Sequence, residues 1–261
     1  MSDDATGAAP AALNAVLTEV RGRVLLITLN RPQAMNAINT DVAQGLLTAF
    51  ELLDGDGGLT AGVLTGTGRG FCAGMDLKAF AASGPPKGLG DVFERGSRKP
   101  LIGAIEGFAL AGGLELALVC DLLVAAENVK IGIPEAGVGL FAGGGALIRL
   151  PGRLPYAVAM EMALTADPIT ARQAHEYGLI ARLTDPGKAV DGALELAERI
   201  ARNAPLSVAA SKAIIRGTHG MTEDEAWVFQ QPLFREVFTS EDAKEGPRAF
   251  AEKRAPQWSG K

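Results

Sequence analysis

The stretch Gly107–Asp121, which reads GFALAGGLELALVCD, decides the fold prediction. Pro100–Ile105 before it is apolar and short, as expected of a buried strand, and GFALAGG then forms a glycine-rich loop. Leu114–Val119 is apolar with helical spacing, and Leu122–Ala126 again has the composition of a strand. Short apolar strands that alternate with helices predict an α/β protein.

The same alternation extends in both directions from this stretch. Towards the N-terminus, the pattern predicts a strand or hairpin over 20–29, a helix over 40–53, a strand over 62–65 and a short helix over 74–82. Beyond Asp185-Pro186-Gly187 the glycine content drops, and helical patterns cover 189–203, 207–216 and 222–238. The C-terminal part is therefore expected to be a separate helical region.

Composition excludes several classes of protein. The 261 residues are 48% hydrophobic and 21% charged, which indicates a folded globular protein. With 25 Lys and Arg against 30 Asp and Glu, the net charge of −5 gives no reason to expect nucleic acid or an anionic membrane as a partner. The first dozen residues are small and polar, typical of a frayed terminus, and they lack the features of a signal peptide. Two cysteines form no disulfide framework, so we expect a cytoplasmic protein.

Common catalytic and cofactor motifs are missing or incomplete. The sequence has no G-x-S-x-G, no H-E-x-x-H and no P-loop motif. Gly68–Ala73 and Gly137–Ala142 fit the dinucleotide fingerprint G-x-G-x-x-A, but neither precedes the continuous helix that such a site needs. His175 and His219, the two histidines, are expected to be structural or solvated.

Two glycine-containing junctions between loop and helix are candidates for an oxyanion hole. In GFCAGMDLK, residues 70–78, Ala73 and Gly74 stand where a loop is expected to turn into a helix, and Gly112–Gly113 stand at a second such junction. The first N–H groups of a helix have no partner within it and lie at the positive end of its dipole. Either junction alone is consistent with a simple tight turn, whereas two that converge on one point would form an oxyanion hole.

Two glutamates accompany these junctions. Glu115 follows Gly112 by three residues, which puts its carboxylate on the same helical face as the Gly112 amide. Its neighbours are apolar, and burial would raise its pKa towards the range of an acid–base catalyst, although a first-turn glutamate also suits the helix dipole. Glu135, held between Pro134 and a glycine run, lies on a loop of constrained direction. The two carboxylates are candidates for a general acid and base pair.

The motifs together resemble those of the crotonase superfamily, specifically the enoyl-CoA hydratase/isomerase family. The resemblance extends from about Leu13 to Trp258 and rests on the strings NRPQAMNAIN, GTGRGFCAGMDLK, GFALAGGLELALVCD, IGIPEAGVGLFAGGG, ALTADPITARQAHEYGLI and AFAEKRAPQW. It implies a spiral of ββα units over residues 13–200. Residues 201–261 would then form a helical region for oligomerisation into a trimer or a dimer of trimers.

The resemblance also assigns roles to residues. It implies that Ala73 and Gly112 supply the oxyanion-hole amides and that Glu115 and Glu135 are the catalytic carboxylates. The implied contacts to the coenzyme A thioester are Ala34, Met35, Ala37, Ala73, Gly74, Met75, Asp76, Leu77, Gly112, Phe250 and Lys253, the last two often reaching a neighbouring subunit's substrate. No metal or further cofactor is implied, because coenzyme A is carried by the substrate.

The implied activity is hydration of a 2-enoyl-CoA thioester, as in fatty acid and lipid metabolism. Two alternatives remain open at this point. GFCAGMDLKA and LELAL are also similar to carnitinyl-CoA dehydratases, so the enzyme could be a dehydratase or isomerase of a polar or branched acyl-CoA. A binding protein for acyl-CoA without turnover is the third interpretation.

Overall fold

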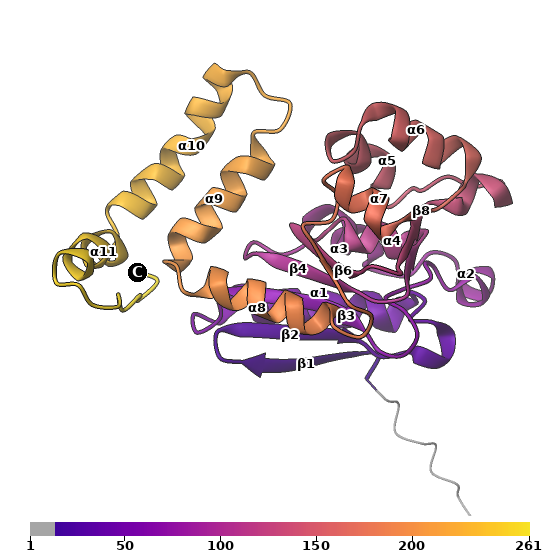
Figure 1. Cartoon of the computed structure of the whole chain (residues 1–261), viewed down its shortest axis with the longest axis horizontal. Coiled ribbons are helices and arrows are strands. Elements are labelled where there is room, and N and C mark those ends of the chain that lie inside the picture. The colour runs from indigo at the N-terminus through magenta and orange to yellow at the C-terminus, as the bar shows by residue number, and fades with distance from the viewer. Residues whose placement is uncertain (1–13) are drawn as a thin grey trace, which may run out of the picture.

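The computed structural model describes residues 14–261 (Figure 1). The N-terminal segment for which the sequence predicts a frayed end, and the first residue of the predicted core region, lie outside the described residues. Within residues 14–261, no helix combines the length and the apolar character needed to cross a membrane.

A six-stranded sheet forms the centre of the body. Its order is β1-β2-β3-β4-β6-β9, in which β1 and β2 form an antiparallel hairpin and all later neighbours are parallel. The hairpin turns at Gly22, whose φ is +60°. The strands are β1 (Val16–Arg21), β2 (Val24–Leu29), β3 (Ala61–Gly66), β4 (Leu101–Ile105), β6 (Leu122–Ala126) and β9 (Arg182–Thr184).

Helices cover both faces of this sheet. Along β2, Leu25 and Ile27 are buried in the core that includes α1 (Thr40–Gly55), while Val24 and Leu26 are buried with α8 (Ala189–Ala201) on the other face. Because both faces are covered, the inner strands β2, β3, β4 and β6 are apolar apart from Thr28 and Thr65, as is usual in parallel sheets. The α/β prediction is confirmed, and α8 lies along the sheet in Figure 1.

A second, smaller sheet contains the start of the stretch GFALAGG. It consists of β5 (Phe108–Leu110), β7 (Lys130–Gly132) and β8 (Ile169–Thr170), with β5 and β7 parallel. The prediction of a loop across GFALAGG was therefore wrong for most of its length, because Phe108–Leu110 pairs with β7 and Gly112 and Gly113 already belong to the following helix. The strands β5 and β7 lead at the same edge into α4 (Gly112–Ala117) and the 3-10 helix η2 (Pro134–Val138).

Short helices pack around these sheets. They are η1 (Pro32–Ala34), α2 (Leu77–Ser83), α3 (Leu89–Arg95), α5 (Ala146–Arg149), η3 (Leu150–Gly152), α6 (Tyr156–Thr165) and α7 (Ala171–Glu176). The helix predicted from Gly74 begins only at Leu77, because the Asp76 side chain accepts a hydrogen bond from the N–H of Ala79 and caps the helix there.

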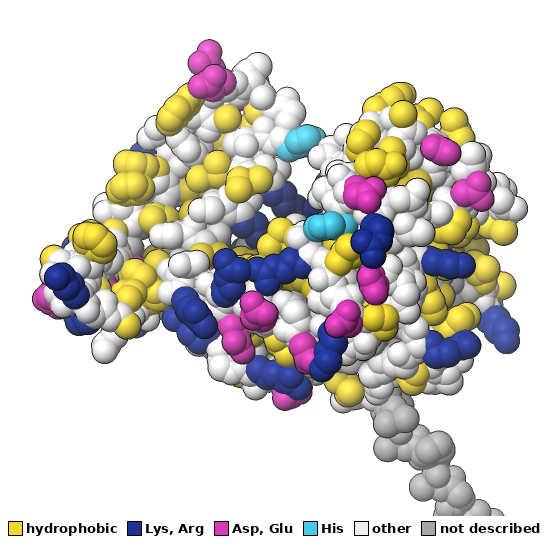
Figure 2. Space-filling view, viewed as in Figure 1, with side chains coloured by type: hydrophobic (Ala, Val, Ile, Leu, Met, Phe, Trp, Pro, Cys, Tyr) yellow, Lys and Arg dark blue, Asp and Glu magenta, His cyan; other side chains and the backbone are white. Residues whose placement is uncertain are grey.

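Three C-terminal helices form an arm that projects from the body (Figure 1): α9 (Pro205–Gly217), α10 (Glu223–Phe238) and α11 (Glu241–Ala251). No residue of α9 or α10, which lie within the described part of the chain, is buried. Ile215, Val228, Phe238 and Phe250 are between 66% and 87% exposed, and hydrophobic side chains are spread over the arm in Figure 2.

Candidate active site

The two glycine-containing loops meet along β5. Cys72 forms a parallel bridge with Ala109, and the Leu110 N–H donates to the Cys72 carbonyl over 3.1 Å. A Cβ atom at Gly113 would overlap the same Cys72 carbonyl, so this position accommodates only glycine. The loop over 70–75 is thereby fixed against the N-terminus of α4, although the two segments are far apart in the sequence.

The main-chain amides of Met75 and Gly112 lie next to each other at this contact. Gly74, with φ +107°, packs against the start of α4, and a Cβ built on Gly112 would lie 3.4 Å from the Met75 nitrogen. Gly112 is the first residue of α4, so its N–H has no partner within the helix. Among residues 14–261, neither N–H donates a hydrogen bond to an acceptor.

The residue that enters α4 has an unusual backbone conformation. Ala111 has φ +51° and ψ −132°, a region that residues with a Cβ rarely occupy. Its N–H donates to the Gly132 carbonyl over 2.9 Å, which ties it to the end of β7. Such strain costs roughly 1–3 kcal/mol and is concentrated at functional sites, where the surrounding structure maintains it.

The prediction for Ala73 was wrong. Its N–H donates to the Met35 carbonyl over 3.1 Å and is therefore not free to bind a substrate oxygen. The error came from placing the start of the helix at Gly74. The capping character of Asp76 was the signal that could have moved the helix start to Leu77 and identified Met75 as the residue with the free N–H.

Glu115 is a buried carboxylate on α4. It is 4% exposed, and its Oε1 accepts a hydrogen bond from the N–H of Ala146 over 3.2 Å. Burial raises the pKa of Glu115, while the N–H groups of residues 144–146 and the charge of Arg149 act in the opposite direction. A raised pKa brings a carboxyl group closer to the range of an acid–base catalyst.

Glu135 lies on η2, directly after β7, and faces the same region. Its Oε2 atom is buried without a hydrogen-bond partner among the described residues. Burial raises the pKa of Glu135, its own N–H lowers it, and the negative charge of Glu115 raises it further. A buried polar atom without a partner calls for a bound molecule or water to satisfy it.

The predicted contacts with the thioester's coenzyme A form a group on one side of this site. Ile38 pairs with Met75 in a parallel bridge, so the segments 34–37 and 73–77 run side by side. Met35 is 44% and Leu77 60% exposed, whereas the Asp76 carboxylate is already occupied by the Ala79 N–H and, at 3.0 Å, by Arg31. The group comprises Ala34, Met35, Ala37, Ala73, Gly74, Met75, Asp76, Leu77 and Gly112.

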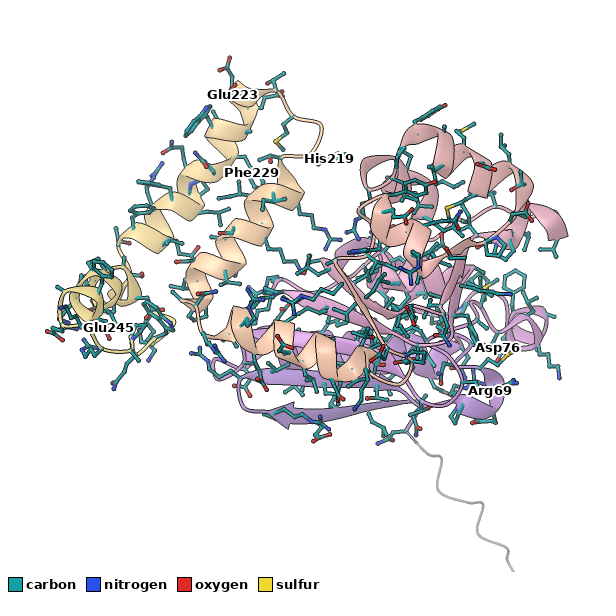
Figure 3. All side chains as sticks on the ribbon, in the orientation of Figure 1. Arg69, Asp76, His219, Glu223, Phe229 and Glu245 are labelled. Atoms are coloured by element: carbon teal, nitrogen blue, oxygen red, sulfur yellow. The ribbon has the colours of Figure 1, made fainter. Side chains whose placement is uncertain are left out.

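Phe250 and Lys253 do not join this group within one chain. They belong to or follow α11 at the end of the arm, and Figure 3 shows Asp76 and Glu245 of α11 at opposite ends of the molecule. The Phe250 side chain is 87% exposed. These two residues could contact a substrate only in another copy of the chain.

The remaining candidates are accounted for by packing. His175 places Nδ1 2.8 Å from the carbonyl of Ile180, a structural contact. The fingerprint over 68–73 is followed by a helix of only seven residues, and the one over 137–142 by a helix of four. Within residues 14–261, no three His, Cys, Asp or Glu side chains are grouped so that they could hold a metal ion.

The site thus places two adjacent N–H groups without acceptors, those of Met75 and Gly112, in a region that also holds the buried Glu115 and the half-buried Glu135. Comparison with known proteins shows to which family the chain belongs. The family model for enoyl-CoA hydratase/isomerase matches residues 19–261. The chain belongs to the enoyl-CoA hydratase/isomerase family.

Individual relatives agree with this assignment over most of their length. The enoyl-CoA hydratase EchA19 of Mycobacterium tuberculosis is 44% identical over 260 residues, with 94% of this chain and 96% of the relative covered. The carnitinyl-CoA dehydratase of Proteus mirabilis is 40% identical, with 92% and 97% covered. The crystal structure of enoyl-CoA hydratase EchA1 from Mycobacterium marinum superimposes with a TM-score of 0.91 at 51% identity, with 95% and 100% covered.

Proposed function

We propose that this protein hydrates 2-enoyl-CoA thioesters, using the amides of Met75 and Gly112 as an oxyanion hole and Glu115 and Glu135 as the acid–base pair. The observation that carries the proposal is the pair of adjacent N–H groups without acceptors among residues 14–261. When water adds to the β-carbon, the electrons of the double bond move towards the thioester carbonyl. Two fixed N–H donors stabilise the resulting negative oxygen far better than solvent does.

Glu115 and Glu135 divide the proton transfers. Glu115 removes a proton from the attacking water, whose oxygen forms a bond to the β-carbon while the enolate develops. The α-carbon of the enolate then takes a proton from Glu135, so that H and OH are both added and the thioester is restored. The support for these roles is that Glu115 is buried, that Glu135 is half-buried with its Oε2 atom covered, and that burial raises the pKa of both.

The substrate's coenzyme A would lie along the segments 34–37 and 73–77. The mechanism requires no metal or redox cofactor, because amides and carboxylates supply each step. The exposed apolar side chains of the arm support a homotrimer or a dimer of trimers, in which Phe250 and Lys253 of one chain contact the substrate of another. The two cysteines are free and buried, which supports a cytoplasmic location.

The test is the loss of ultraviolet absorbance from the conjugated enoyl thioester. Glu115→Gln and Glu135→Gln should each lower kcat by about 10²–10⁴-fold while binding of coenzyme A thioesters is preserved. A matched control is Glu127→Gln, because Glu127 forms an exposed ion pair with Arg172 outside the site. Wild-type rates in both active-site variants would refute the assigned roles.

A second candidate function is dehydration of a polar acyl-CoA. The 40% identity to the carnitinyl-CoA dehydratase of Proteus mirabilis favours this alternative. The same two carboxylates would then remove water in the reverse direction. Mass spectrometry of the products from simple 2-enoyl-CoA and from β-hydroxyacyl-CoA substrates with a charged acyl group separates the two activities.

A further inference from the structure

A half-buried arginine contacts the loop that surrounds the Glu115 carboxylate. Arg149 lies at the end of α5, and its Nη1 donates to the Gly144 carbonyl over 3.3 Å. Its Nη2 donates to the carbonyl of Phe93, in the last turn of α3. The guanidinium therefore ties two separate backbone segments together, which its planar, forked geometry favours.

The loop that Arg149 holds is the one that binds the carboxylate. Ala146 donates its N–H to Glu115, and the amides of Gly144 and Gly145 also stabilise the ionised form of Glu115. Gly145 has φ +108°, and a Cβ there would lie 2.5 Å from Arg149 Nη1, so the guanidinium packs directly against the loop. Successive N–H groups arranged in this way form an anion-binding concavity.

We propose that Arg149 is a positioning residue for hydration: it holds the Gly144–Ala146 loop in the conformation that presents its N–H groups to Glu115. The proposal rests on the proposed catalytic role of Glu115. Arg149 does not touch the reacting atoms in this scheme. It acts through the loop and through its positive charge.

The charged groups around Glu115 and Arg149 set the direction of the expected pH effect. The cation of Arg149 lowers the pKa of Glu115, and the negative charge of Glu115 in turn raises the pKa of Glu135. Arg149 is itself flanked by Arg153 and Arg216. Removal of the Arg149 charge takes away a group that favours ionised Glu115, so the pKa of that carboxyl should rise.

Arg149→Gln tests the charge. The acid limb of the kcat/KM pH profile, which follows ionisation of the base, should shift to higher pH, whereas KM for the thioester should change little. Arg153→Gln is the matched control, because Arg153 is also half-buried and donates to a backbone carbonyl, that of Cys120, over 3.0 Å. An acid limb that stays at the wild-type position in Arg149→Gln, with a uniform loss of rate at every pH, would overturn the proposal.

Arg149→Lys tests whether the two guanidinium hydrogen bonds, to Gly144 and Phe93, position the loop. This variant is also informative if Arg149→Gln does not fold. Lysine keeps the charge but cannot span both carbonyls in the same geometry, so the acid limb should stay in place while kcat falls about tenfold. A wild-type kcat in Arg149→Lys contradicts the positioning role.

A titration that does not depend on turnover separates this proposal from the proposed function. Carbon-13 NMR of labelled glutamate carboxyls, with the Glu115 signal identified by its loss in Glu115→Gln, measures the pKa directly in wild type and Arg149→Gln. An upward shift together with full activity of Glu115→Gln would refute the catalytic role of Glu115, and with it the role of Arg149 in hydration, while the contact between Arg149 and the loop that binds Glu115 would stand as a structural feature. If the pKa of Glu115 is the same in wild type and in Arg149→Gln, the inference is overturned, whatever the activities of the variants are.

Discussion

Replacement of Gly144 by alanine should misplace the catalytic carboxylate. A Cβ at this position would lie 2.6 Å from Glu115 Oε2 and 2.5 Å from the ring of Phe93, whereas ordinary contacts begin near 3.4 Å. The carboxylate terminates a flexible side chain, so it would move by the difference between these values, about 0.8 Å. Displacements of about 1 Å cost roughly 10²-fold in rate, so we expect that loss in kcat/KM for Gly144→Ala.

Gly144→Ala should have a smaller effect on the stability of the fold than on the rate of hydration. Overpacking against the Phe93 ring costs about 1–3 kcal/mol, which a chain of this size can tolerate. Gly143→Ala is the matched control, because a Cβ there lies 3.5 Å from the Phe141 ring and should alter neither rate nor melting temperature. Steady-state hydration assays and thermal denaturation measure both effects. Equal rates for Gly144→Ala and Gly143→Ala would show that the carboxylate position derived from Gly144 is incorrect.

Three further outcomes are expected. Gly113→Ala should prevent folding, because its Cβ overlaps the Cys72 carbonyl; a cooperative thermal transition at the wild-type temperature would contradict this. Burial raises the pKa of Cys72 and of Cys120 to about 12, so neither thiol should react with a disulfide reagent at pH 8 until denaturant is added. Arg254 and a backbone N–H lower the pKa of Glu245 from its ordinary 4.5 to about 2, so this carboxylate stabilises the fold fully above pH 4.5 and loses the effect as the pH falls towards 2. The melting-temperature difference between wild type and Glu245→Gln should therefore narrow from pH 6 to pH 3, and a constant difference would exclude an ionic contribution.

Features set by local chemistry could be predicted from the sequence. The apolar strands, the junction between loop and helix at Gly112–Gly113 and the helices of the C-terminal arm follow from periodicity and glycine positions. The buried surroundings of Glu115 follow from the apolar residues on every side of it, since a helix that is apolar all round lies in the core.

Only the tertiary structure decided which amide is left without an acceptor. Met75 and Gly112 become neighbours because β5 aligns the loop over 70–75 with α4, a long-range contact that carries no periodic signal. The cap at Asp76 and the hydrogen bond from Ala73 to Met35 moved the free N–H two residues along the chain. Local patterns determine which segments become helices and strands, whereas the identity of a free donor depends on every acceptor that folding brings within reach of it.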